Sequence, residues 1–222
     1  MHQFTLRHRK GHLFIDLDGD DWLLDTGAPS SFGASGVVIG EQEFSIPGDY
    51  MGLDAEELSG LVKCPAAGII GADVLNGFDI LIDIRNQAVT FSEEEIPLEG
   101  QALKMTDFMG IPIVQANISD ENRSMFFDTG AQICYFQGDS LTSFPAIGAM
   151  SDFYPGFGEF ETETYRVDAM LGAMNFELIC GSLPGMLGMT LSMAGVEGII
   201  GNEILVDRVL GYFPRRQLLV LS

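Results

Sequence analysis

Two short segments each place an aspartate at the end of an apolar run and follow it with the same three residues. WLLDTGA contains Asp25 and MFFDTGA contains Asp128, so the DTGA copies lie 103 positions apart. Two carboxyl groups that share one proton can take a proton from water and give one to a carbonyl group, which is general acid–base chemistry. When such groups lie a few ångströms apart, one apparent pKa rises strongly and the other falls.

The elements that would position these aspartates occur twice along the chain. Residues 68–92, GIIGADVLNGFDILIDIRNQAVTFS, align without a gap on residues 198–222, GIIGNEILVDRVLGYFPRRQLLVLS. GHLFIDL also matches GIPIVQA, and VIGEQEFSI matches MLGAMNFEL. Each copy therefore predicts a strand, a hairpin turn, a strand ending in DTGA and a hairpin about Gly40 or Gly172. A strand ending in IIG, a short helix and a last pair of strands follow.

Composition favours a mainly β protein with a sizeable core. Of the 222 residues, 46% are hydrophobic and 27 are glycine, and short apolar runs alternate with turn residues. Long amphipathic helical patterns are few. The segment SEEEIPLEGQ interrupts the apolar pattern with acidic residues, a proline and a glycine. We therefore predict an N-terminal lobe over residues 1–97 and a C-terminal lobe over residues 98–222.

The net charge is −21, from 32 acidic and 11 basic residues. Such a surface repels phosphate groups, which disfavours nucleic acids and anionic membranes as partners. No apolar run approaches the length of a membrane span, and the N-terminal residues do not resemble a secretory signal. We expect a cytoplasmic protein. The three cysteines, Cys64, Cys134 and Cys180, contain no CxxC pair, and we interpret them as reduced, buried thiols.

Two other motifs receive structural interpretations. The acidic segment DLDGDD at residues 16–21 has Asp and Gly at the sixth and twelfth positions, where an EF-hand loop needs Gly and Glu. We expect a hairpin turn there. His2, His8 and His12 have no acidic or cysteine ligand at a supporting spacing, so we expect them in an exposed N-terminal strand.

With its doubled apolar-apolar-DTG and apolar-apolar-Gly segments, the chain resembles the aspartic peptidases of the retropepsin and pepsin type over nearly its whole length. The alanine after each DTG resembles retropepsins, whereas GADVL and GNEIL resemble the short helix of pepsins. The resemblance implies an all-β, bilobed acid protease fold made of two pseudo-symmetric β lobes with short helices. It would correspond to a retropepsin dimer fused into one chain.

The resemblance also implies roles for both DTGA loops. Asp25 and Asp128 would form a catalytic dyad that activates water, and no metal or organic cofactor is needed. Each glycine would permit a tight turn that leaves N–H groups for the carboxylates, and each threonine would hydrogen-bond across the lobe interface. The alternative is that each aspartate only caps a buried turn, although a duplicated buried charge pair is costly to keep. The supporting loop residues are Thr26, Gly27, Ala28, Thr129, Gly130 and Ala131.

Peptidases of this family cover their substrate with a β-hairpin flap, and the spacing here predicts a single one. Gly40 follows Asp25 by 15 positions, whereas Gly172 follows Asp128 by 44. We therefore expect no flap in the N-terminal lobe and one hairpin near residues 153–168. The alternative is an ordinary surface loop with its aromatic residues on the core. The predicted flap and substrate-binding residues are Tyr154, Gly156, Phe157 and Gly158, with Tyr154 and Phe157 facing the cleft.

The sequence thus leads to the hypothesis of a monomeric aspartic endopeptidase that hydrolyses peptide or protein substrates bound as extended strands. Two alternatives stay open. The chain could be a catalytically inactive peptide-binding or regulatory module with the same fold, because its first lobe is trimmed. It could also be a self-processing peptidase with no other substrate.

Overall fold

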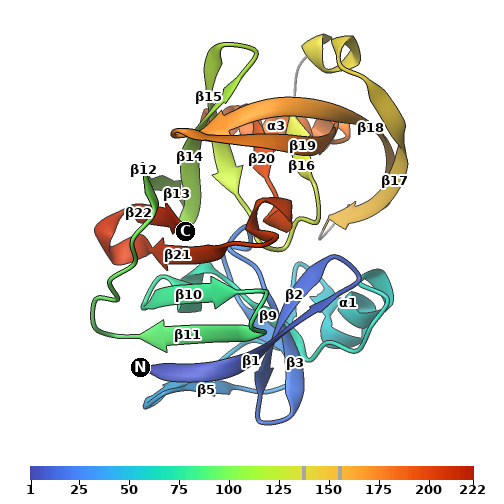
Figure 1. The fold of residues 1–222 in the computed structure, drawn as a ribbon. Coiled ribbons are helices and arrows are strands. Elements are labelled where there is room, and N and C mark those ends of the chain that lie inside the picture. Colours follow the sequence, from blue (N-terminus) through green and yellow to red (C-terminus); the bar gives the residue numbers. More distant parts are fainter. Residues whose placement is uncertain (137–138, 155–156) are drawn as a thin grey trace.

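Most of the chain that the structure describes is β-strand. The computed structural model describes residues 1–136, 139–154 and 157–222. The described strands form a ten-stranded sheet, an eight-stranded sheet and two short hairpins, accompanied by short helices. Figure 1 shows the eight-stranded sheet in the upper half of the molecule and most of the ten-stranded sheet in the lower half, with β21 of the ten-stranded sheet at mid-height. The all-β class expected from the sequence is confirmed.

The ten-stranded sheet combines strands from both ends of the chain. Strand β10 pairs antiparallel with β21, so the C-terminal strands continue a sheet that is built mainly by the first hundred residues. The lobe boundary between residues 97 and 98 stays a prediction. In spatial order the strands are β12 (Gln101–Lys104), β22 (Leu218–Leu221), β21 (Val209–Phe213), β10 (Asp79–Asp83), β11 (Ala88–Ser92), β1 (His2–Arg9), β2 (His12–Leu17), β3 (Asp20–Leu24), β9 (Gly68–Ile70) and β4 (Phe32–Gly33).

The eight-stranded sheet ends in a long antiparallel hairpin, β17–β18. Its turn lies where Tyr154 faces Gly158 in the register, within the segment where the sequence predicts a flap. In spatial order the strands are β13 (Thr106–Phe108), β14 (Ile111–Ile118), β15 (Glu121–Phe127), β20 (Gly198–Ile200), β16 (Cys134–Phe136), β19 (Met174–Gly181), β18 (Gly158–Leu171) and β17 (Ala146–Tyr154).

Short elements complete both halves. The hairpins expected about Gly40 and Gly172 are present, and both glycines adopt positive φ angles, +66° and +60°. The segment DLDGDD forms the turn between β2 and β3, as expected. The remaining elements are β5 (Val37–Ile39), β6 (Gln42–Phe44), β7 (Asp49–Tyr50), β8 (Leu53–Asp54), α1 (Ala55–Leu61), α2 (Ala72–Leu75), α3 (Gly185–Ala194) and the 3-10 helices η1 (Asp139–Ser143), η2 (Asn202–Leu205) and η3 (Pro214–Arg216).

The strands around the two DTGA segments follow one pattern. Strand β9 lies between β3, with which it is parallel, and β4, with which it is antiparallel; β20 lies in the same way between β15 and β16. The first residue of each central strand must be glycine. A Cβ atom at Gly68 would lie 2.1 Å from the carbonyl oxygen of Phe32, and one at Gly198 would lie 2.1 Å from that of Tyr135. This close approach brings the end of each DTGA strand beside an IIG strand.

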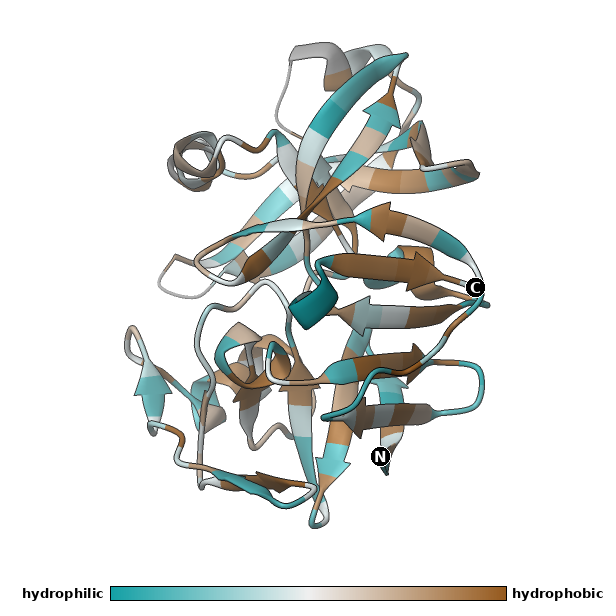
Figure 2. Cartoon of the chain, turned by 90° about the vertical axis from the view of Figure 1, so that its left-hand side faces the viewer, coloured by the Kyte–Doolittle hydropathy of each residue, from teal (hydrophilic) through white to brown (hydrophobic). Residues whose placement is uncertain are grey.

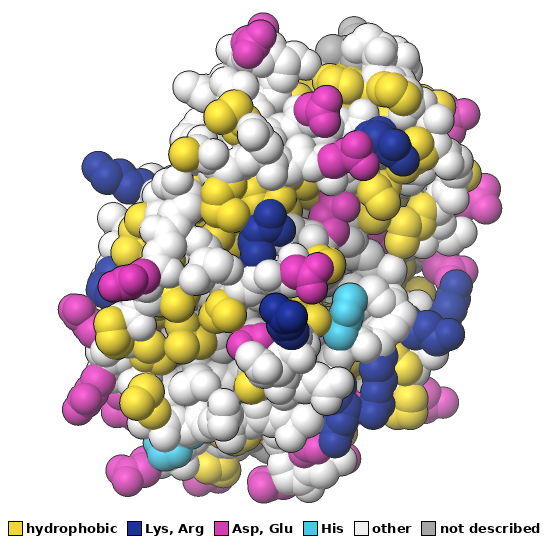
Figure 3. Space-filling model, in the orientation of Figure 1, with side chains coloured by type: hydrophobic (Ala, Val, Ile, Leu, Met, Phe, Trp, Pro, Cys, Tyr) yellow, Lys and Arg dark blue, Asp and Glu magenta, His cyan; other side chains and the backbone are white. Residues whose placement is uncertain are grey.

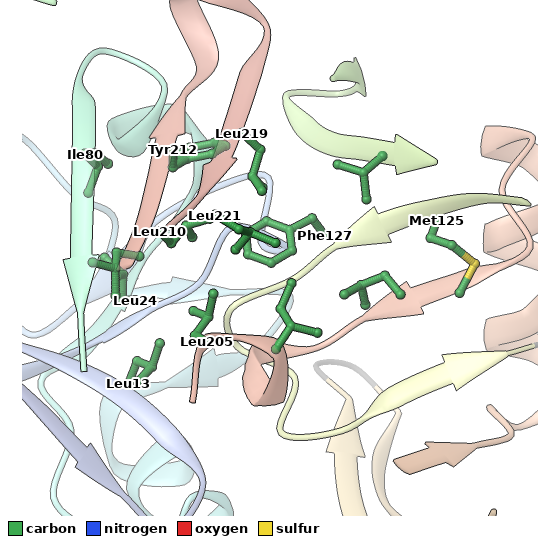
Figure 4. Close-up of a cluster of buried hydrophobic side chains, with 14 of the residues drawn as sticks. Leu13, Leu24, Ile80, Met125, Phe127, Leu205, Leu210, Tyr212, Leu219 and Leu221 are labelled. Atoms are coloured by element: carbon green, nitrogen blue, oxygen red, sulfur yellow. The ribbon is translucent and has the colours of Figure 1, made fainter. Parts of the chain in front are cut away.

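The main hydrophobic core is shared by both halves. Figure 4 shows Leu13 and Leu24 from the first half near Phe127, Leu210 and Leu221 from the second. All five side chains are buried. Burial of such side chains stabilises each by roughly 1.5–3 kcal/mol relative to exposure. Because Leu24 and Phe127 directly precede the two aspartates, the shared core fixes the two DTGA segments relative to each other.

Polar residues occupy the outside of the molecule. In Figure 2 the strand interiors near the middle of the molecule are coloured as hydrophobic, and many hairpin turns as hydrophilic. Figure 3 shows acidic side chains spread around the visible face rather than gathered in one patch. No helix within the described ranges has both the length and the apolar character needed to cross a membrane.

Candidate active site

Each DTGA loop is held at both ends by the neighbouring IIG segment. The N–H of Asp25 donates to the carbonyl of Ile70 at 3.0 Å, and that of Asp128 donates to Ile200 at 2.9 Å. At the far end of each loop, the alanine carbonyl accepts a hydrogen bond from the residue after IIG, at 2.8 Å in the first half and 2.9 Å in the second. The local sequence therefore builds the same rigid loop twice.

Within each loop, backbone N–H groups point at the aspartate carboxyl group. In the first loop, Oδ1 of Asp25 accepts two such hydrogen bonds at 2.9 Å; in the second, Oδ1 of Asp128 accepts two at 2.8 and 3.2 Å. Donors of this kind favour the ionised carboxylate. The donors are Gly27, Ala28, Gly130 and Ala131.

Thr26 and Thr129 join the two loops by reciprocal hydrogen bonds. The N–H of each threonine donates to the hydroxyl oxygen of the other at 3.0 Å. Each hydroxyl then donates to a carbonyl of the opposite half, Thr26 to Phe127 at 2.8 Å and Thr129 to Leu24 at 2.7 Å. Both threonines are buried. The cross-interface hydrogen bonds expected for the threonines are present, and they hold the aspartates at one place.

The two carboxyl groups lie side by side and hydrogen-bond to each other. Each packs against the glycine of the opposite loop. A Cβ atom at Gly27 would lie 2.2 Å from Cγ of Asp128, and one at Gly130 would lie 2.5 Å from Cγ of Asp25. Any larger side chain would displace the carboxyl groups. The glycines are therefore required by the meeting of the loops as well as by the turn.

The surroundings of the two carboxyl groups raise the pKa of both, so the pair retains a proton. Burial raises the pKa of Asp25 well above its usual range, and the charge of Asp128 and its hydrogen bond raise it further, against the lowering effect of Ala28 and Gly27. Burial also raises the pKa of Asp128, but the hydrogen bond from Asp25 and the loop N–H groups lower it, while the charge of Asp152 raises it. With one proton held between them, one carboxyl group can donate a proton while the other accepts one.

A cavity of about 240 Å³ opens above the two carboxyl groups, which are half-buried because they line it. Both halves supply its walls in equivalent positions. Around Asp25 these are apolar residues of β3, β4 and β9, and around Asp128 they come from β15, β16 and β20. The equivalent pairs are Leu23 and Phe126, Phe32 and Tyr135, and Ile69 and Ile199.

The β17–β18 hairpin contributes lining residues to this cavity. Tyr154 lines it, and burial and the charges of both dyad aspartates raise the pKa of its hydroxyl. Phe157 is 38% exposed, is not among the described residues that line the cavity, and packs edge-on against Phe160, with ring centroids 6.3 Å apart. Gly158 has φ +92°, as a turn requires. Gly156 lies outside the described residues.

The first half contributes a smaller hairpin that the sequence did not reveal. Strands β7 and β8 pair through Tyr50 and Leu53, and Tyr50 and Met51 line the cavity. Each strand is two residues long, so neither alternation nor a long apolar run marks it in the sequence. The expectation of a single flap stays a prediction.

A third acidic group in the cavity was also missed. The Tyr135 hydroxyl donates to Oδ2 of Asp152, and the N–H of Phe153 donates to Oδ1 at 2.8 Å. Burial and Asp152 raise the pKa of Tyr135, so the hydroxyl keeps its proton and remains a donor. No sequence signal links two residues 17 positions apart on strands that do not pair directly.

The expectation that all three histidines lie in an exposed strand is wrong for His12. Its side chain is 2% exposed and sits beside the second DTGA loop. Nδ1 lies 3.2 Å from the carbonyl oxygen of Gly130, and Nε2 lies 2.9 Å from the amide nitrogen of Gln132. Burial lowers the pKa of the ring, which favours its neutral form.

The cysteines are free, as expected, but only two of them are buried. Cys134 and Cys180 are buried neighbours on β16 and β19, whereas Cys64 is partly exposed. Within the described ranges, no group of three or more His, Cys, Asp or Glu side chains is arranged to hold a metal ion.

Comparison with known proteins gives a distant structural similarity. No protein-family model and no curated protein sequence matches the chain. Among solved structures, a retropepsin-like aspartic protease from Rickettsia conorii is similar over 55% of this chain and 88% of its own, with 14% sequence identity and a TM-score of 0.39. A similarity at this level does not establish the family or the function, so the assignment depends on the geometry of the site.

Proposed function

We propose that this protein is an aspartic endopeptidase that hydrolyses peptide bonds with water activated between Asp25 and Asp128. One observation carries the proposal: two carboxyl groups from separate loops hydrogen-bond to each other at the base of a cavity. Each also accepts backbone N–H groups from its own loop. A pair that only capped two turns would not need to meet, nor to face a cavity.

The proposed mechanism starts from a dyad that shares one proton, with that proton on Asp25. Asp128 accepts a proton from water as the water oxygen attacks the peptide carbonyl carbon, and Asp25 donates its proton to the carbonyl oxygen. When the tetrahedral intermediate collapses, the C–N bond breaks and the leaving nitrogen takes the proton from Asp128. Asp25 recovers its proton from a hydroxyl of the intermediate. Protons balance over the cycle, and the dyad returns to its starting state.

The cavity walls and hairpins support a peptide as the substrate. Strand β17 is the edge strand of its sheet, and the β7–β8 hairpin is a separate two-stranded sheet, so both have an unpaired edge that suits a chain bound in extended form. The apolar walls around both aspartates would take side chains on either side of the scissile bond. Both aspartates come from one chain, so we propose that the monomer is active.

The test is hydrolysis of a mixed peptide pool from about pH 3 to about pH 8, followed by mass spectrometry. Asp25→Asn and Asp128→Asn should each lower the rate at least about 100-fold, because each removes a general acid or base. Asp168→Asn is the matched control, since it removes one carboxylate from an exposed position on β18. Its rate should equal that of the parent protein.

Other outcomes separate the alternatives. Undiminished hydrolysis by either dyad variant would reject the proposal. Binding of peptides or of a pepstatin-type transition-state mimic without any hydrolysis would favour the inactive peptide-binding module. Cleavage confined to the protein's own chain would favour the self-processing peptidase.

A further inference from the structure

The two halves of the cavity differ in chemistry at one equivalent position. Phe32 follows Asp25 by seven positions, and Tyr135 follows Asp128 by seven. Each faces the central residue of a three-residue strand: Phe32 lies opposite Ile69 of β9, and Tyr135 lies opposite Ile199 of β20. The first-half wall is therefore apolar at this point, whereas the second-half wall carries a hydroxyl group.

That hydroxyl group holds a carboxylate at the cavity. Tyr135 donates to Oδ2 of Asp152, and the N–H of Phe153 donates to Oδ1. A carboxylate has about four acceptor positions, so these two bonds leave capacity for a further donor. Asp152 is half-buried and lines the same cavity as the dyad. It lies near the tip of β17, which reaches down from the upper half toward the lower half (Figure 1).

The charge of Asp152 is not balanced by an ion pair within the described parts of the chain, whose salt bridges do not include it. Lys10 and Lys63 line a second, smaller cavity that Asp152 also borders, together with Glu159, but neither lysine reaches ion-pair distance of it. A half-buried carboxylate is stabilised most by a cation that comes within hydrogen-bonding distance.

Apolar groups close to Asp152 suit the stem of a long cationic side chain. Phe126, Phe160 and Leu187 line the second-half side of the cavity, and all belong to or pack on one hydrophobic cluster. Lysine and arginine bury their methylene groups along such walls while the charged end stays with a polar partner.

We propose that the second-half side of the cavity binds a lysine or arginine side chain of the substrate through Asp152, while the first-half side binds an apolar side chain. This inference rests on the proposed peptidase function, because it assigns substrate residues on either side of the scissile bond. It makes the two sides of the dyad unequal in specificity even though their loops are alike.

The test uses peptide pairs that differ only in lysine against norleucine, which has a similar stem and no charge. Each pair places the varied residue on one side of a bond to phenylalanine, in both orders. For one order, kcat/KM of the parent should be at least about tenfold higher with lysine, the size of one charge-assisted hydrogen bond. Equal or lower values with lysine in both orders would overturn the inference.

Site variants test which side chain causes the preference for lysine over norleucine. Asp152→Asn should bring the lysine-to-norleucine ratio to about one, whereas Glu159→Gln, a charge removal on the same hairpin, should leave the ratio unchanged. Tyr135→Phe removes the hydroxyl that holds the Asp152 carboxylate and should reduce the preference without abolishing it. A ratio that survives Asp152→Asn would show that another group binds the cation. If Asp152→Asn does not fold, loss of the parent's preference with rising salt provides the second measurement, because salt screens charge pairs.

Failure of the proposed function is distinguishable from failure of this inference. If the parent hydrolyses no peptide, the same peptides are labelled and their Kd values are measured by fluorescence anisotropy. Tighter binding of the lysine peptide, lost in Asp152→Asn, would uphold the lysine site without peptidase activity. Equal Kd values for the lysine and norleucine peptides would overturn it.

Discussion

Replacing Thr26 with valine tests whether the reciprocal threonine contact holds the two halves together. The change removes a hydroxyl that accepts from the N–H of Thr129 and donates to the carbonyl of Phe127. Both partners are then left buried without this bond. Each unsatisfied buried group costs about 1–3 kcal/mol, so Thr26→Val should lower the free energy of unfolding by about 2–6 kcal/mol. Domains of this kind are stable by only about 5–15 kcal/mol, so the effect is large.

The assay is urea-induced unfolding followed by the fluorescence of Trp22, the single tryptophan, which is buried three residues before Asp25. Far-UV circular dichroism in the same samples shows whether the two halves unfold together. Thr26→Ser keeps the hydroxyl and should restore most of the stability. Thr5→Val, on the exposed side of β1, should change it by less than about 0.5 kcal/mol. A loss below about 1 kcal/mol for Thr26→Val, or an equal loss for Thr26→Ser, would refute the reasoning.

Two further predictions concern the dyad and the thiols. Because burial raises the pKa of Asp25 in the folded protein, its contribution to stability is present at low pH and is lost as the pH rises through that pKa. Asp25→Asn should therefore melt at a higher temperature than the parent at about pH 8, with the difference shrinking toward pH 4; a lower melting temperature at pH 8 would contradict this. With a thiol-reactive dye, we expect one fast-reacting thiol in the native protein, Cys64, and three in denaturant, because burial raises the pKa of Cys134 well above its usual range. Rapid reaction of a second native thiol would show that the β16–β19 region opens.

Much of the fold could be predicted because its signals are local. Apolar runs, turn residues and the two IIG segments predicted the hairpins, the central strands and the short helices after them. Alternation and turn chemistry act over a few residues, so the sequence carries them directly. The same holds for the inside of each DTGA loop, where N–H groups two and three residues later reach the aspartate.

Parts of the site could not be predicted because they depend on packing between distant residues. His12 looks like one of three surface histidines in the sequence, yet it is buried and hydrogen-bonds to the carbonyl of Gly130, 118 positions away. Tyr50 and Met51 reach the cavity from a hairpin whose strands are too short to leave a pattern. Phe157 was expected to face the cleft but packs beside Phe160, because the tip of a hairpin can turn its side chains either way.

The sequence by itself determined that two aspartates would each end a buried strand in the same tight loop, within an all-β chain. Only the tertiary structure decided that the two carboxyl groups share a hydrogen bond and that Asp152 joins them at one cavity. The physical reason is the distance along the sequence between the residues that determine each feature. Strand, turn and loop are set by neighbouring residues, whereas the meeting of Asp25, Asp128 and Asp152 depends on how the shared core and the β17–β18 hairpin bring the two halves together.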